Sequence, residues 1–186
     1  MESGSGPVSL WGAAQFNMMN SQSVWPADVV YVVSLFYNLF YNNELIMRCF
    51  DLDRTSWGEA AGIPFVRLPF VGAHPAQPEL RRRFPGDVDW QFSGNPEDGY
   101  FHGTTMHCFP AICSATRLLR GDRPKDNKFA VNLSRDFTLA LRYTQPSSDL
   151  RFVFESRAYL SKSVGAPNVL CKEYWSEIVA LRLVVN

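Results

Sequence analysis

The chain has 186 residues, 46% of them hydrophobic and 19% charged, with 18 basic and 18 acidic side chains. This composition excludes a mainly disordered protein and indicates one globular domain or two small ones. The zero net charge hides an asymmetry, because residues 1–100 hold 6 basic and 11 acidic side chains while residues 101–186 hold 12 and 7. An excess of basic side chains in the second half favours an anionic ligand.

Cysteine content and the first residues bear on the compartment. Four cysteines are too few for a disulfide scaffold, and the N-terminus lacks the basic region and unbroken apolar run of a secretory signal. We therefore expect an intracellular protein, in the cytoplasm or the nucleus. The spacing of His102, His107, Cys108 and Cys113 matches no closed zinc motif, so we expect no metal site.

Residues 1–95 are expected to form a helical, loop-rich N-terminal region, either separate or part of the same domain as the rest. Pro26 and Asp28 predict a helix start, and the run from Asp28 to about Phe50 is apolar nearly all round. Its aromatic part, residues 29–41, has 13 residues, whereas a membrane span needs about 20. We expect no membrane span, but a buried helix or a face that docks onto a protein partner.

The stretch from residue 51 to residue 95 contains many prolines and glycines and indicates a loop-rich connector with short strands such as Ile63–Phe70. Beyond residue 96 the predicted elements are strands over 99–105, 129–133, 151–156 and 178–185, and helices over 108–119 and 137–143. Ser134-Arg135-Asp136 is a cap for the second helix. Strands and helices in this order, with short connections, predict an α+β fold.

Four elements in this half follow one another in a particular order. His102-Gly103-Thr104 ends a strand, a helix follows, a second strand and helix lead to Tyr143, and Glu177 opens a late strand. In this order, residues 99–186 resemble the ADP-ribosyltransferase fold, in particular its PARP-like or diphtheria-toxin-like branch. The resemblance implies split antiparallel β-sheets with flanking helices over residues 96–186, a helical, aromatic-rich region before them, and NAD bound in the cleft between the sheets.

The resemblance also implies a role for each motif. Glu177 looks like the catalytic glutamate, which binds the nicotinamide ribose and stabilises the oxocarbenium-like state as the glycosidic bond breaks. His102 looks like the histidine that hydrogen-bonds a ribose of NAD, so it counts with Glu177 as central to catalysis. Gly103 would offer its backbone to the nicotinamide carboxamide, and Thr104 beside it is also expected to bind NAD. Tyr143 falls where an aromatic ring stacks on the nicotinamide.

Two positions depart from the pattern of that family. Asn132 stands where a tyrosine is usual, so it would contact NAD by hydrogen bonding without an aromatic wall, and Ala140 replaces a serine. The retained Glu177 favours an enzyme, a mono-ADP-ribosyltransferase of the glycosyltransferase class that uses NAD as substrate and modifies a protein or nucleic-acid acceptor. The two departures favour the alternative, a catalytically degraded module of the same fold that serves as a binding or structural subunit of a larger assembly.

Overall fold

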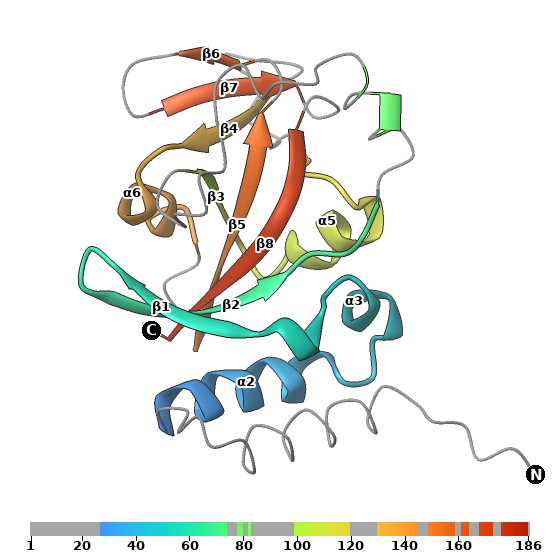
Figure 1. Cartoon of the computed structure of the whole chain (residues 1–186), viewed down its shortest axis with the longest axis vertical. Coiled ribbons are helices and arrows are strands. Elements are labelled where there is room, and N and C mark those ends of the chain that lie inside the picture. Colours follow the sequence, from blue (N-terminus) through green and yellow to red (C-terminus); the bar gives the residue numbers. More distant parts are fainter. Residues whose placement is uncertain are drawn as a thin grey trace, which may run out of the picture.

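The protein is an α+β protein built on one antiparallel β-sheet, as the ribbon in Figure 1 shows. The α+β class predicted from the sequence is confirmed. The computed structural model describes residues 27–73, 78–79, 82, 99–119, 130–144, 149–158, 161–163, 168–172 and 176–185.

The aromatic N-terminal run forms two helices, α2 (Ala27–Phe40) and α3 (Glu44–Arg48). The prediction of one helix over 28–50 is therefore wrong. The break lies at Asn43, whose side chain accepts a hydrogen bond from the backbone N–H of Ile46 at 3.1 Å. Asparagine competes in this way with the helical backbone and is favoured at helix starts, so a new helix begins there.

A β-hairpin follows the helices and a single 3-10 turn, η1 (Leu52–Arg54). Its strands are β1 (Ser56–Ala60) and β2 (Ile63–Pro69), and the two residues between them have positive φ angles of 52° and 75°. Such a turn matches the twist of paired strands and closes a hairpin tightly. The strand expected over 63–70 is confirmed, whereas β1 was not predicted.

The second half contains the elements in the predicted order, with two additional strands. The helix expected to reach residue 119 ends at residue 115, because Thr116 adopts a left-handed conformation with φ 52°. The short strands over 161–163 and 168–172 were not predicted. In chain order the elements are β3 (Tyr100–Thr104), α5 (Phe109–Ala115), β4 (Ala130–Ser134), α6 (Phe137–Leu141), β5 (Leu150–Ala158), β6 (Ser161–Ser163), β7 (Asn168–Lys172) and β8 (Ser176–Val185).

The described strands form one sheet in the order β1-β2-β8-β5-β3-β4-β7-β6, with antiparallel neighbours throughout. β5 and β8 pair along the whole length of β5, but β3 and β4 share one pair, Phe101 with Ser134. Where the resemblance implies split antiparallel sheets, the described strands form one sheet with a narrow seam between β3 and β4, and that single pair joins the halves. β2 pairs with β8, so the N-terminal hairpin extends the same sheet as the second half.

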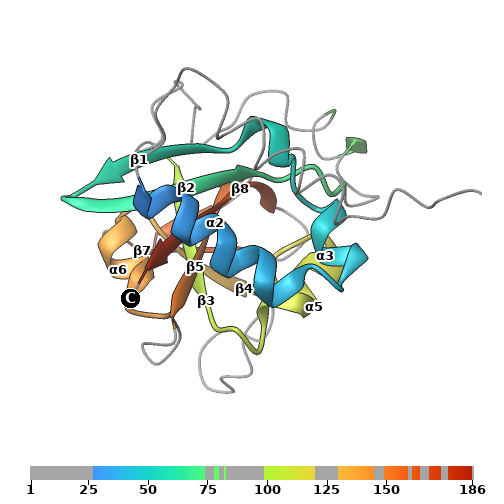
Figure 2. The ribbon, with the colours of Figure 1, turned by 90° about the horizontal axis from the view of Figure 1, so that it is seen from below.

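Each face of the sheet is covered by a different hydrophobic cluster. The larger cluster packs α2, α3 and α5 against one face, with Phe109 stacked on Phe152 at 4.6 Å between ring centroids. The view in Figure 2 shows α2 lying across this side. The smaller cluster places α6 on the opposite face, where the Phe137 ring meets Phe101 at 5.5 Å.

Candidate functional site

His102 lies in the middle of β3, next to the seam with β4, and its side chain is half-buried. Its Nδ1 is 2.9 Å from the backbone carbonyl oxygen of Asn132. Because a carbonyl only accepts hydrogen bonds, Nδ1 carries the proton and donates the hydrogen bond, which leaves Nε2 as an acceptor in the neutral ring. Burial lowers the pKa of His102, and the hydrogen bond to Asn132 opposes that shift only in part. The neutral ring is therefore the main form near pH 7.

Gly103 is in direct contact with the end of α6. A Cβ atom at this position would fall on the carbonyl oxygen of Ala140 and would lie 3.3 Å from Cγ2 of Thr144. Only glycine lets α6 pack this closely on β3. The neighbouring Thr104 is buried opposite Phe152, so its side chain faces the other side of the sheet.

Asn132 and Tyr143 both have exposed side chains. Asn132 lies in β4, opposite Leu170 of β7, and its backbone rather than its amide contacts His102. Tyr143 follows α6 and is 53% exposed, so its ring is available to a ligand or a partner but is not enclosed.

Glu177 is 7% exposed and lies at the start of β8, directly opposite Arg157 of β5. Gly103 of β3 is also paired with β5, where it lies opposite Val153, so positions along β5 relate Gly103 to Glu177. Val153 and Arg157 are four residues apart, so Gly103 and Glu177 lie on the same face, separated by about 13 Å along the strand.

The structure brings some of the predicted site residues together and separates others. His102 contacts Asn132, and Gly103 contacts α6. Alternation along β3 directs the side chain of His102 to the face opposite Glu177, because His102 is opposite Phe154, three residues from Arg157 on β5. A shared ligand would therefore have to reach Glu177 on one face and His102 at the seam.

A buried charged cluster, Arg67-Glu155-Arg182, lies on the face that carries Glu177. Nε of Arg182 is 2.6 Å from Oε1 of Glu155, and Nε of Arg67 is 3.1 and 2.9 Å from the two carboxylate oxygens. Arg182 is fully buried, and Glu155 is 1% exposed. Sequence reasoning missed this cluster, although one signal was present: a single arginine inside the apolar run of the last strand.

Possible metal ligands do not gather in the described part of the chain, where no group of three or more such side chains is found. His107 and Cys108 are exposed, whereas Cys113 is buried in the larger cluster. There a hydrogen bond with Cys49 raises the pKa of the Cys113 thiol, and burial raises it further.

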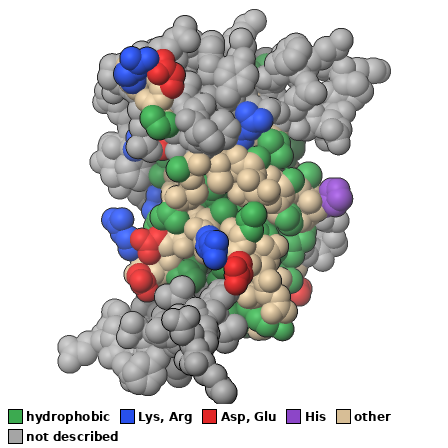
Figure 3. Space-filling model, turned by 90° about the vertical axis from the view of Figure 1, so that its right-hand side faces the viewer, with side chains coloured by type: hydrophobic (Ala, Val, Ile, Leu, Met, Phe, Trp, Pro, Cys, Tyr) green, Lys and Arg blue, Asp and Glu red, His purple; other side chains and the backbone are tan. Residues whose placement is uncertain are grey.

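Figure 3 shows hydrophobic patches between a few charged side chains on the right-hand side of the view in Figure 1.

The comparisons with known proteins identify no family. No protein-family model matches the sequence, and no curated protein matches it.

Proposed function

We propose that the protein is an ADP-ribosyltransferase-like domain that binds NAD and transfers ADP-ribose to a protein or nucleic-acid acceptor. One observation carries the proposal: the strands that bear Glu177, His102 and Asn132 lie within the run β8-β5-β3-β4 of a single sheet. His102 borders the narrow seam in this run, whereas Gly103, α6 and Glu177 share the opposite face, with Glu177 two strands away from the seam.

In this proposal each residue has a defined chemical task. Nε2 of His102 accepts a hydrogen bond from a ribose hydroxyl, because Nδ1–H is already donated to Asn132. The Glu177 carboxylate accepts a hydrogen bond from a hydroxyl of the nicotinamide ribose. It stabilises the positive charge that develops on that ribose as the bond to nicotinamide breaks. Nicotinamide leaves with the bonding electrons, and a nucleophile of the acceptor forms the new bond to the ribose.

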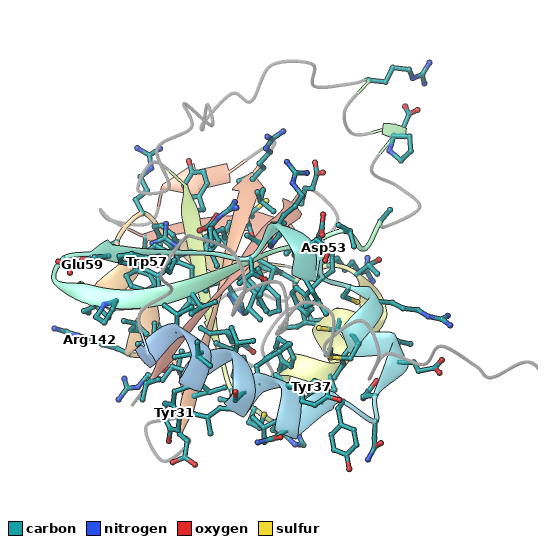
Figure 4. All side chains as sticks on the ribbon, turned by 60° about the horizontal axis from the view of Figure 1, so that its bottom comes forward. Tyr31, Tyr37, Asp53, Trp57, Glu59 and Arg142 are labelled. Atoms are coloured by element: carbon teal, nitrogen blue, oxygen red, sulfur yellow. The ribbon has the colours of Figure 1, made fainter. Side chains whose placement is uncertain are left out.

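A second candidate function is a binding or structural module of the same fold. Three observations favour it: Asn132 provides no aromatic wall, Ala140 fills the space beside Gly103, and the ring of Tyr143 is exposed. The outer side of α2 offers a surface for such a role, because Tyr31 and Leu39 are 55% and 49% exposed. Figure 4 shows Tyr31 on the side of α2 that faces away from the sheet. No helix in the described ranges is long and apolar enough to cross a membrane.

Titration of the full chain with NAD, ADP-ribose and nicotinamide, followed by thermal unfolding, tests the proposal. A ligand at 100 times its Kd stabilises the folded state by about 2.7 kcal/mol, which is readily measured as a rise in Tm. NAD at millimolar concentration is expected to raise Tm. If neither NAD nor nicotinamide does so, the enzyme is excluded and the binding module is favoured.

Nicotinamide release separates binding from chemistry. Glu177→Gln is expected to lower the rate of NAD cleavage at least about 100-fold, because the carboxylate charge acts in the transition state. Glu59→Gln is the matched control, since Glu59 is an exposed glutamate on β1, labelled in Figure 4, and its substitution should leave the rate unchanged. Equal rates for both variants would exclude Glu177 from the reaction.

A further inference from the structure

Arg182 contacts four other elements from inside the protein. Its guanidinium carbon lies 4.1, 4.6 and 4.9 Å from the ring centroids of Phe65, Phe101 and Phe137, which belong to β2, β3 and α6. Its Nε is paired with Glu155 of β5. A planar cation stacks on aromatic rings in a way that lysine does not reproduce.

The position of Arg182 follows from the alternation of β8. Leu181 and Leu183 on either side belong to the larger hydrophobic cluster, so Arg182 must face the opposite side, beneath α6. Burial of a charged guanidinium is expensive, and apolar residues of similar volume often fill such a space at equal or greater stability. A contribution to stability alone is therefore a weak explanation for an arginine at position 182.

Two of the three rings connect Arg182 to the candidate site. Phe101 immediately precedes His102 and Gly103, while Phe137 is the first residue of α6. The carbonyl of Ala140, near the end of the same helix, occupies the space beside Gly103. One guanidinium thus contacts both β3 and α6 where the two elements meet.

We propose that Arg182 is a positioning residue that holds α6 on β3 and so fixes the Ala140 carbonyl beside Gly103, which bounds the surface where the nicotinamide end of NAD would bind. The placement of α6 is a property of the protein itself, while the link to nicotinamide rests on the proposed function. The guanidinium acts through Phe101 and Phe137 and does not touch the substrate.

Hydrogen exchange on the full chain tests the placement of α6 directly. In Arg182→Met, which leaves Glu155 paired with Arg67, amides of residues 137–144 are expected to exchange about 10-fold faster relative to those of β5. Arg182→Lys keeps the charge without the planar group and should show the same local change. It also serves as the second variant if Arg182→Met does not fold.

Leu183→Ala is the matched control, because it opens a cavity on the other face of β8. It should lower global stability without a change confined to α6. If Arg182→Met and Leu183→Ala raise exchange in the same pattern, the positioning role is overturned.

Ligand binding by the same variants distinguishes this inference from the proposed function. Arg182→Met should weaken NAD and nicotinamide about 10-fold and leave ADP-ribose, which lacks nicotinamide, unchanged; general damage to the fold would weaken all three. Equal weakening of all three ligands would contradict the link to nicotinamide. Faster exchange confined to α6 in a chain that binds no NAD would support the positioning role and count against the proposed function alone.

Discussion

Nδ1 of His102 lies 2.9 Å from the backbone carbonyl oxygen of Asn132, and this hydrogen bond spans the seam between β3 and β4. The strands share a single residue pair there, so the side chain adds a second connection between the two halves of the sheet. A hydrogen bond from a side chain to a carbonyl also fixes the orientation of the ring. The connection between the two halves of the sheet and the proposed contact with the ligand thus depend on the same imidazole ring of His102.

Replacement of His102 should change the pH dependence of stability. Burial holds the pKa of His102 below its ordinary value of 6.5, so between the folded-state pKa and about pH 6.5 the unfolded state binds a proton that the folded state does not. The free energy of unfolding should therefore fall as the pH decreases from about 6.5, and it should fall less in His102→Leu. Urea unfolding at pH 7.5, 6.5 and 5.5 measures the difference. His107→Leu, at an exposed position, is the control, and identical pH profiles for all three proteins would contradict the prediction.

Substitution of Gly103 should separate β3 from α6. In Gly103→Ala the new methyl group meets the backbone carbonyl of Ala140, which cannot rotate away, so we expect a loss of at least about 1–3 kcal/mol in the free energy of unfolding. Gly62→Ala is the matched control: its φ is +75° but the space around it is open, so only backbone strain of about 1 kcal/mol is expected. Urea denaturation gives both values. A smaller loss at Gly103 than at Gly62 would show that α6 yields easily.

Local sequence signals predicted much of the second half of the fold. Asp136 was expected to begin a helix, and its carboxylate accepts hydrogen bonds from the N–H groups of Thr138 and Leu139. The apolar runs in the predicted strands correspond to β5 and β8, since alternation and β-branched residues are encoded within a few neighbours. Such features depend on residues close in sequence.

Other features depend on residues far apart in sequence and could not be predicted. Glu155 and Arg182 look like outward-facing charges of two strands, and only the covering rings of β2, β3 and α6 make that face an interior. The contact between His102 and the backbone of Asn132 joins residues 30 positions apart and involves no distinctive side chain on the second strand. The helix break at Asn43 is a local feature by contrast, and it was missed because the whole of 28–50 was interpreted as one apolar helix.

Removal of the cap at Asp136 should destabilise α6. Asp136→Ala is expected to lower the free energy of unfolding by about 1 kcal/mol. Asp136→Ser should retain most of the stabilisation that the cap provides, because serine also caps helices. The hydrogen bond from the Thr138 hydroxyl lowers the pKa of Asp136 below its ordinary value of 3.8, so the stabilisation is present above that pH and is lost as the pH falls through the folded-state pKa. Urea unfolding at pH 7 and pH 3 tests this. A difference between wild type and Asp136→Ala that is larger at pH 3 would contradict it.

The two sides of α2 should differ sharply in their effect on stability. Phe36 is fully buried and contacts Phe40, Phe50 and Phe109, so Phe36→Ala should cost about 3–5 kcal/mol. Tyr31→Ser, on the exposed side, should change the free energy of unfolding by less than about 0.5 kcal/mol. Chemical denaturation distinguishes the two. A large loss in Tyr31→Ser would mean that the outer side is covered within the protein and is no docking surface.

Loss of Glu155 should be strongly destabilising, because this carboxylate pairs with the fully buried Arg182 and with the partly buried Arg67. Glu155→Gln leaves Arg182 fully buried without its carboxylate, so we expect a loss of about 3–5 kcal/mol, as for other broken buried ion pairs. Simultaneous replacement of all three by apolar residues, Arg67→Met, Glu155→Leu and Arg182→Met, removes the charges together and should recover most of that loss. Urea unfolding of the single and triple variants compares them. If the triple variant is no more stable than Glu155→Gln, the cluster contributes to stability itself; if it is as stable as the wild type yet its α6 amides exchange faster, the charges serve to position α6.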